Sequence, residues 1–417
     1  MSAFTAVHRA LGERPGPLTD AMIQALVDQA VPEGGDLEFK RDFPSGSLVD
    51  SDLPKDVAAL ANAGGGVIVY GISDAGHKAG PRTDVVLTAN LERDLRKVAA
   101  TKVAPGLINL GITPLGQSPH RCVVIEVPAS PDAPHLFFSK EGGLRAPLRV
   151  GADTHWMTER QLEAAYRARV TRVQDRAAQL ADLYQRAHHG CDISHRAWFI
   201  AAAVPRSEAT QRRLPLDNAQ KCFRDAVPAG LELAVLGAGA HPLHHGVNVD
   251  VLRPGLRSWV APRRSTGGIP SPTDATASIG DTGTITLSAA VGAHNRADDQ
   301  SPGGHEVVME AVECALADFL GLLRATAAHL PVIDYDLQFG IAWTGEQDLQ
   351  LLRPRRLGHG FGEPFRETVP FIPVHATLAT HVDDGTYQRE AYELARDCAN
   401  QAAAPAPVAF MAPPQPA

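Results

Sequence analysis

Residues 53–74 read LPKDVAALANAGGGVIVYGISD. Apolar side chains at helical spacing in the first ten residues predict a helix, and the glycine run at residues 64–66 would end it. The apolar run VIVYGIS predicts a buried strand, and Asp74 comes directly after it. A helix followed so closely by a strand indicates a domain in which helices cover a sheet.

Segments on both sides of this stretch continue the alternation of helix and strand. Residues 18–31 have apolar side chains at helical spacing after Thr19, a residue type that caps helix N-termini. Further patterns predict strands at residues 37–40, 107–113 and 121–127 and a helix at residues 90–100. We therefore predict a mixed α/β or α+β domain over residues 17–157, with its sheet half covered.

The remaining chain predicts three further segments. Residues 158–189 predict one long helix, which begins with a capping box of Thr158 and Gln161 and carries six arginines. It is either a connecting helix with a solvated basic face, or a helix that faces nucleic acid or a second copy of the chain. Residues 190–400 predict a second α+β domain of unknown role, and the Pro/Ala-rich residues 401–417 predict a disordered tail. The predicted fold class of the whole chain is thus α+β.

Several local patterns in residues 190–400 have structural interpretations. Residues 231–237 predict a strand, and residues 305–330 predict a long amphipathic helix with a solvated face at Glu306, Glu310 and Glu313. The histidines at positions 241, 244 and 245 are most simply loop residues, because no second pair of metal ligands accompanies them.

Composition limits the classes of function. The chain has 417 residues, with 39 basic and 47 acidic side chains and a formal net charge of −8. This charge excludes binding to nucleic acid or membranes by bulk attraction, but it leaves room for a local basic groove. Five scattered cysteines without a C-x-x-C pair favour a reducing compartment. Because no apolar run reaches the ~18 residues of a membrane span and no signal-peptide core is present, we expect a cytoplasmic protein without a membrane partner.

Three carboxylates stand out near the predicted strands. Glu33 and Glu38 are five residues apart, and Asp74 follows the strand at residues 67–73. If the fold gathers them, they repel one another unless a proton or cation joins them. Mg²⁺ or Mn²⁺ suits oxygen ligands, and Lys40 and Arg41 are placed to hold a phosphate beside such an ion. The alternative is that these are ordinary scattered surface acids.

Four motifs occur in a recognisable order. They are E-x4-E-F-K at residues 33–40, A-N-A-G-G-G at 61–66, G-I-S-D at 71–74 and R-V-G-A-D-T-H at 149–155. Together they resemble the Schlafen/AlbA-type domain, earlier also described as a divergent ATP-binding module. The resemblance covers about residues 17–165.

The resemblance implies a function and a site. It implies an α/β nucleic-acid-binding fold, and endonuclease action on structured RNA such as tRNA in the family's nuclease members. By position, Glu33, Glu38 and Asp74 would be the catalytic carboxylates that hold Mg²⁺ or Mn²⁺. Lys40 would be the fourth catalytic residue and would offset phosphate charge.

Further residues are candidate contacts to nucleic acid, together with Lys40. They are Arg41, Asn62, Gly65, Gly66 and Arg149. The glycines and Asn62 also have a structural interpretation, as a helix end and a tight turn. Because the chain is acidic overall, nucleic-acid binding requires a basic strip on one face, with a steep salt dependence. The other basic residues considered for that strip are Arg82, Arg93, Arg96, Lys97 and Arg145.

The sequence leaves three functions open. The first is a nucleic-acid-binding protein that acts as a metal-dependent endoribonuclease. The second is a non-catalytic DNA-binding transcriptional regulator whose C-terminal domain senses a signal. The third is an ATP-binding module, which the absence of a G-x4-G-K-S/T phosphate loop disfavours. Since this chain has one copy of a domain that animal Schlafens carry twice, a homodimer is a further expectation.

Overall fold

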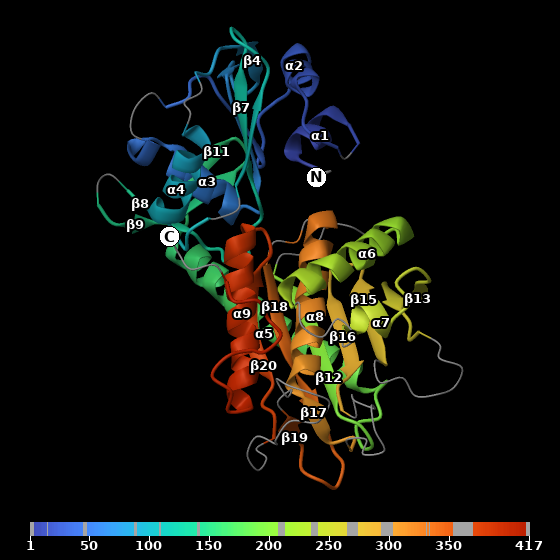
Figure 1. The fold of residues 1–417 in the computed structure, drawn as a ribbon. Helices are drawn as coiled ribbons and strands as arrows, with labels where there is room; N and C mark the ends of the chain where they lie inside the picture. Colours follow the sequence, from blue (N-terminus) through green and yellow to red (C-terminus); the bar gives the residue numbers. More distant parts are fainter. Residues whose placement is uncertain are drawn as a thin grey trace. The chain divides into compact units, whose positions relative to one another are not determined.

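The computed structural model describes residues 4–14, 16–44, 48–86, 90–107, 110–139, 142–206, 213–234, 241–264, 274–292, 303–330, 332, 334–352 and 370–413. The chain divides into two compact units, residues 1–174 and residues 175–417. Both mix helices and sheets, so the predicted α+β class is confirmed (Figure 1). No helix in the described residues is long and apolar enough to cross a membrane.

The first unit is built on a four-stranded sheet with the order β1-β2-β7-β6. Its strands are β1 (Leu37–Lys40), β2 (Gly66–Tyr70), β7 (Cys122–Val127) and β6 (Gly111–Leu115). β1 runs parallel to β2, and the other neighbours are antiparallel.

Helices cover both faces of this sheet. They are α1 (Ala6–Leu11), α2 (Asp20–Asp28), α3 (Leu53–Asn62) and α4 (Leu91–Lys102). α3 and α4 pack with Ile68 on one face, and α1 and α2 pack with Val67 and Val69 on the other. The prediction of a half-covered sheet is therefore wrong, because successive apolar residues of β2 point to opposite faces and both need cover.

Short strands surround the main sheet. They are β3 (Ile72–Asp74), β4 (Ala79–Arg82), β5 (Val103–Ala104), β8 (Leu136–Phe138), β9 (Leu144–Arg145), β10 (Pro147–Val150) and β11 (Asp153–Trp156); η1 (Leu48–Asp50) is one turn of 3-10 helix. The strand predicted as one run is broken at Gly71, which has φ +97° and where a Cβ would lie 2.9 Å from the Arg121 carbonyl oxygen. This break turns β3 off the main sheet into a hairpin with β4, and Asp74 ends its first strand.

The predicted long helix is confirmed as α5 (Glu159–His188). Its capping box is formed as expected: the Thr158 hydroxyl accepts from the Gln161 backbone N–H (3.3 Å), and the Gln161 side chain accepts from the Thr158 N–H (2.9 Å). Its residues 175–188 belong to the second unit, where Leu180 and Tyr184 pack against one face of a sheet.

That sheet has seven antiparallel strands in the order β13-β14-β15-β16-β12-β18-β20. The strands are β13 (Arg253–Gly255), β14 (Ser258–Ala261), β15 (Ala275–Gly280), β16 (Ile285–Ala290), β12 (Trp198–Pro205), β18 (Asp334–Ala342) and β20 (Val374–Ala379). β17 (Glu306–Val308) and β19 (Gln350–Leu352) pair separately, in parallel.

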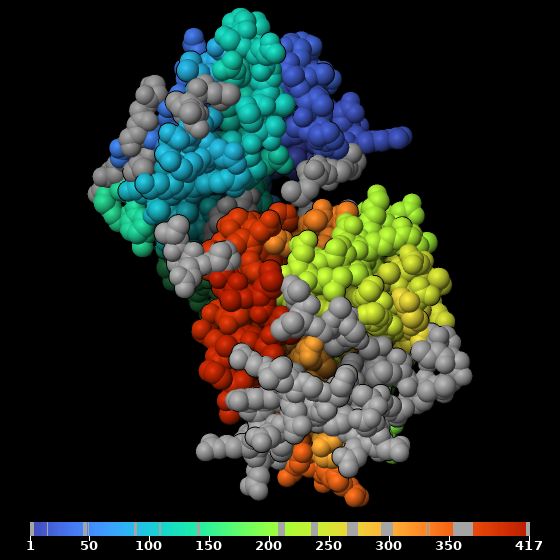
Figure 2. Space-filling view, viewed as in Figure 1, coloured from blue at the N-terminus to red at the C-terminus, as the bar shows by residue number. Residues whose placement is uncertain are grey.

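The helices of this unit are α6 (Leu216–Leu233), α7 (Pro242–His245), α8 (Met309–His329) and α9 (Asp384–Gln401). α6, α8 and α9 share one core with the sheet, and α9 (red) and α6 (yellow-green) are visible on the face of this unit that Figure 2 shows. The strand predicted at residues 231–237 is wrong over residues 231–233, which end α6; residues 235–240 lie outside the described residues. Leu233 and Ala226 are buried at helical spacing, a pattern that the strand prediction overlooked.

The C-terminal segment and the acidic face of α8 also differ from expectation. Glu313 is 0% exposed, and its carboxylate accepts hydrogen bonds from the backbone N–H groups of Val408, Ala409 and Phe410. Burial raises the pKa of Glu313, although these three donors act in the opposite direction. Residues 402–413 are therefore not a disordered tail, and Glu313 is not on a solvated face. Backbone donors make burial of this carboxyl group tolerable.

The histidine cluster has a structural role at its first member. His241 is the buried N-cap residue of α7, with Nδ1 2.7 Å from Oδ1 of Asp318 in α8 and Nε2 2.9 Å from the Ala234 carbonyl oxygen. Both ring nitrogens are thus engaged by the protein, which leaves no ring nitrogen of His241 for a metal ion.

Candidate functional site

The first candidate carboxylate, Glu33, is fixed from two directions. Its Oε1 accepts a hydrogen bond from the backbone N–H of Phe39 in β1 at 2.7 Å. Its own backbone N–H donates to the carbonyl oxygen of His77 in the β3–β4 turn at 2.8 Å. The segment before β1 is thereby tied to the hairpin that carries Asp74.

Asp74 organises the turn of that hairpin. Its Oδ1 accepts from the backbone N–H of His77 at 2.6 Å, and Gly76 and His77 both have positive φ. The turn directs the His77 ring toward Glu33, so that Nδ1 lies 3.3 Å from Glu33 Oε2. As a result, one ligand atom from each of Glu33, Asp74 and His77 lies within 4.8 Å of the other two.

Glu38 lies in different surroundings from Glu33 and Asp74. It is 4% exposed, with Oε1 2.6 Å from Lys40 Nζ and Oε2 3.1 Å from Arg149 Nη1. Arg149 is itself buried and places Nη2 4.0 Å from Glu33 Oε2, so one guanidinium stands between the two glutamates. The structure therefore brings together Glu33 and Asp74, as predicted, but not all three carboxylates around one point.

A further acid, Asp56 of α3, belongs to the same buried network. It is 2% exposed, and its carboxylate lies 3.2 Å from Lys40 Nζ and 3.7 Å from Lys55 Nζ. Burial and the neighbouring Glu38 raise the pKa of Asp56 to about 6, although both lysines act against the shift. We did not predict Asp56 from the sequence. Its signal is helical spacing, because it shares the buried face of α3 with Leu53 and Leu60.

Lys40 connects the two carboxylates of this network. Burial alone would lower the pKa of Lys40, but attraction to Asp56 and Glu38 outweighs burial and raises it. The ammonium group is therefore charged at neutral pH, and a third of its side chain is still exposed.

The donor set determines which cation the cluster of Glu33, Asp74 and His77 would suit. Two carboxylates and one imidazole fit Mn²⁺ better than Mg²⁺, because Mg²⁺ prefers oxygen ligands. Glu33, Asp74 and His77 fit a divalent cation on this ground. Glu38 fits less well, since Lys40 and Arg149 already neutralise its charge. His77 is the residue that the sequence argument missed; it lies three positions after Asp74 in a glycine-containing turn.

Three of the predicted nucleic-acid contacts have structural roles within the domain. The side-chain amide of Asn62 donates to the carbonyl oxygens of His135 and Pro147 and accepts from the His135 N–H. A Cβ on Gly65 would lie 2.6 Å from the Ala129 nitrogen, and one on Gly66 would lie 2.8 Å from the Asp36 oxygen. These positions pack the end of α3 against its own domain, and contact to nucleic acid stays a prediction for them.

The predicted basic strip is largely neutralised. Six of its eight basic residues pair with acidic neighbours: Lys40, Arg41, Arg82, Arg93, Arg96 and Arg149. Of these, Arg41 and Arg93 are the most exposed, at 70% and 73%, and their pairs with Asp42 and Asp94 are loose, at 3.9 and 3.6 Å. Within the described residues, no acidic partner is seen for Lys97 or Arg145. A continuous strip of unpaired positive charge therefore does not form from these residues.

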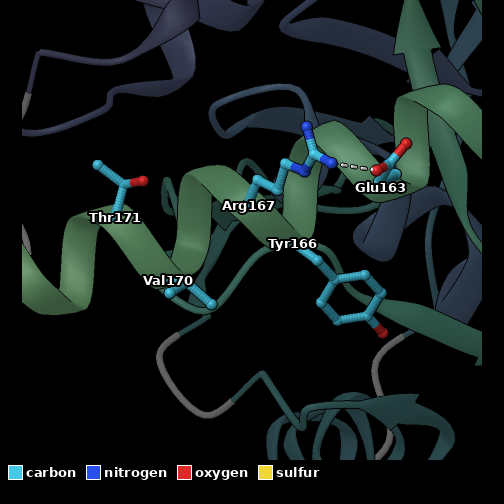
Figure 3. A pocket seen from close by; sticks show the side chains of 5 residues that line it. All are labelled: Glu163, Tyr166, Arg167, Val170 and Thr171. Carbon is cyan, nitrogen blue, oxygen red and sulfur yellow. Dashed lines mark ion pairs between the residues drawn. The ribbon is translucent and has the colours of Figure 1, made fainter.

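Helix α5 presents a shallow hollow in its N-terminal half. Tyr166 and Val170 line the hollow together with Arg167, which pairs with Glu163 of the preceding turn (Figure 3). The pairing reduces the positive charge that this part of α5 offers to a phosphate backbone.

Comparison with known proteins confirms the resemblance found in the motifs. Residues 33–158 match the family model described as Schlafen, AlbA_2. No curated protein matches the chain.

Among the solved structures that match are two at 20% identity. One is the DIP2311 protein from Corynebacterium diphtheriae, with a TM-score of 0.24; the match covers 51% of this chain and 34% of that one. The other is the N-terminal domain of a protein related to the ATP-dependent DNA helicase RecG, from Nitrosomonas europaea; its TM-score is 0.23, and the match covers 33% of this chain and 90% of that one. The chain thus spans about a third of the length of the first structure.

Proposed function

We propose, from the premise that residues 33–158 form a Schlafen AlbA_2 domain, that this protein binds nucleic acid and hydrolyses its phosphodiester backbone with a divalent cation. The observation that carries the proposal is the convergence of Glu33, Asp74 and His77, whose ligand atoms lie within 4.8 Å of one another. Structured RNA such as tRNA is the first substrate to test, because the resemblance implies it.

Each charged group has its own role in this proposal. A bound divalent cation lowers the pKa of a coordinated water and offsets charge on the phosphate. Glu33, Asp74 and His77 hold the cation, and Mn²⁺ suits this donor set better than Mg²⁺. Lys40, which remains protonated at neutral pH, offsets phosphate charge from the partly exposed side of the network. Arg149 keeps Glu33 and Glu38 apart and in place.

A second candidate is a non-catalytic DNA-binding regulator whose C-terminal unit senses a signal. One observation favours it. The charge of Glu38 is neutralised by Lys40 and Arg149, so this carboxylate is a weaker cation ligand than the nuclease pattern of the family implies. An ATP-binding module is the third candidate, and the missing phosphate loop makes it the weakest.

A cleavage and binding assay separates the candidates. The full chain is incubated with tRNA, single-stranded RNA or duplex DNA in Mn²⁺ or Mg²⁺, beside the variants Asp74→Asn and His77→Ala. Asp153→Asn and His120→Ala remove the same side-chain types from exposed positions and serve as matched controls. We expect Mn²⁺-dependent cleavage that both site variants lose and both controls keep.

The other outcomes are equally informative. Binding without cleavage, unchanged in all variants, supports the regulator. Cleavage that survives in Asp74→Asn and His77→Ala contradicts the proposed site. A saturable shift in melting temperature with ATP revives the third candidate.

A further inference from the structure

An aromatic and basic patch lies on the first unit, outside the charged network of Glu33, Glu38, Lys40, Asp56 and Arg149. The rings of Phe137 and Trp156 stack with centroids 5.9 Å apart and planes within 6° of parallel. The guanidinium carbon of Arg145 lies 5.2 Å from the centre of the Trp156 ring. Trp156 remains 44% exposed in spite of these two contacts.

Three strands bring these side chains together. Phe137 of β8 and Arg145 of β9 are direct cross-strand partners, so their side chains lie on the same face of that hairpin. Trp156 ends β11 of the neighbouring β10–β11 ribbon. β8, β9 and β11 are all labelled in the first unit in Figure 1. Contacts from separate strands make this a shaped surface rather than one exposed side chain.

The charge of Arg145 is available to a ligand. Within the described residues, Arg145 stacks on Trp156 and pairs with no carboxylate, unlike six of the eight basic residues considered for the basic strip. An arginine held over an aromatic ring keeps its N–H donors free at the edge of the guanidinium plane. Such donors match the oxygens of a phosphate.

The patch and the charged network share one face of a ribbon. In the β10–β11 ribbon, Trp156 pairs with Pro147, and Thr154 pairs with Arg149. Cross-strand partners, and residues two apart in a strand, lie on the same face. Trp156 is therefore on the face of Arg149, whose guanidinium contacts Glu38, about 7 Å further along the strand. One nucleotide spans about this distance, so a base held at Trp156 would leave the next phosphate near the network.

We infer that Trp156, supported by Phe137 and Arg145, is a stacking platform for unpaired bases. The substrate class of the domain is then single-stranded or looped nucleic acid rather than perfect duplex. A duplex keeps its bases stacked on one another, whereas an unpaired base offers a free aromatic face to a tryptophan. Stacking also supplies affinity that the mostly paired basic residues of this domain do not. This inference rests on the proposed function.

Fluorescence anisotropy with labelled oligonucleotides tests the platform. The full chain is titrated into a 12-nucleotide single strand and a 12-base-pair duplex in EDTA, so that no cleavage occurs. The variants are Trp156→Ala, Trp156→Phe and Arg145→Ala, with Tyr166→Ala as a matched control at an exposed aromatic residue of α5. We expect Trp156→Ala to weaken single-strand binding about tenfold or more, while Trp156→Phe stays within about threefold of the unsubstituted chain. Duplex binding and the Tyr166→Ala control should change by less than twofold.

The outcomes distinguish this inference from the proposed function. Unchanged single-strand affinity in Trp156→Ala overturns the platform alone, while a lack of any nucleic-acid binding by the unsubstituted chain overturns both. Equal losses on single strand and duplex overturn the assignment of substrate class. A change in oligomeric mass in Trp156→Ala, without a change in oligonucleotide affinity, would instead make the patch a contact between copies. Mn²⁺ binding by Trp156→Ala, measured by electron paramagnetic resonance, confirms that the domain is folded.

Discussion

Glu33 and Glu38 lie five residues apart and both side chains are 6% exposed, yet the fold gives them different partners. Glu33 precedes β1 and faces the β3–β4 turn, where His77 and Asp74 are exposed. Glu38 lies within β1, and strand alternation directs it with Lys40 toward α3 and Asp56. In the first cluster, exposed Asp74 and His77 lie beside the buried Glu33 side chain. In the second, each buried carboxylate lies against a basic partner.

The difference shows which part of the site is suited to ligands and which part supports it. A buried carboxylate needs fixed positive partners, and Lys40 and Arg149 supply them to Glu38. Glu33 lies 4.0 Å from Arg149, a looser pair than the 3.1 Å pair of Glu38, and it faces two exposed side chains. A divalent cation can therefore supply the positive charge that Glu33 and Asp74 lack. Arg149 belongs to both regions, because it contacts both glutamates.

Removing Arg149 should have the largest effect, because it breaks both regions together. Arg149→Met leaves Glu38 with Lys40 alone and removes the cation between the two glutamates. We expect the free energy of unfolding of the first unit to fall by about 3–5 kcal/mol. Urea unfolding, followed by hydrogen exchange in β2, measures this change. Arg121→Met, at a residue outside the network, is the control. A loss below about 1 kcal/mol in Arg149→Met would show that the buried Glu38 does not depend on Arg149 for charge compensation.

The pH dependence of the free energy of unfolding should report on the buried carboxyl group of Asp56. The folded pKa of Asp56, about 6, lies above its ordinary value of 3.8, so the folded state binds more protons than the unfolded state between these values. Stability contributed by Asp56 is therefore present at low pH and is lost as the pH rises through 6. Relative to Asp56→Asn, the unsubstituted chain should lose about 2–3 kcal/mol between pH 4 and 7.

Chemical denaturation of both proteins at several pH values measures the Asp56 contribution. Asp28→Asn, at an exposed position on α2, is the matched control. A difference between the unsubstituted chain and Asp56→Asn that does not vary with pH would mean that Asp56 is not held in an unfavourable ionised form.

Cation affinity should separate the two glutamates directly. Glu33→Gln removes a ligand of the cluster that Glu33 forms with Asp74 and His77, and we expect Mn²⁺ affinity to fall about tenfold or more. Glu38→Gln changes a residue outside that cluster, and we expect less than a threefold change. Isothermal titration with MnCl₂ measures both. If Glu38→Gln lowers Mn²⁺ affinity more than Glu33→Gln does, then Glu38 coordinates the cation as the sequence predicts. Its ion pair with Lys40 must then rearrange.

How far the sequence predicts this molecule depends on the kind of interaction. Local patterns were sufficient for α5 and its Thr158–Gln161 cap, and the motif order was sufficient to identify the domain. Pairings between residues that are distant in the sequence could not be predicted from it. Arg149 lies more than a hundred positions after Glu33 and Glu38, so nothing in their spacing shows that it would neutralise Glu38.

The turn that brings His77 to Glu33 was also missed, because it depends on positive φ angles in residues 76 and 77 and on the break at Gly71. Helix α6 was missed for a different reason. Its apolar residues read equally well as a short buried strand when only its last turn is considered.

Salt dependence of nucleic-acid binding provides the smallest but most discriminating effect. A basic strip would release many counterions, and the logarithm of affinity would fall steeply with the logarithm of salt concentration. In the structure, most candidate basic residues pair with acids, and within the described residues Lys97 and Arg145 are the ones for which no acidic partner is seen. We therefore expect a shallow slope of about −1 to −3 for a single-stranded oligonucleotide between 50 and 300 mM KCl. Arg145→Ala should make the slope shallower by less than about one, whereas a slope steeper than about −6 would show that the ion pairs open and that phosphate contacts, not stacking, dominate binding.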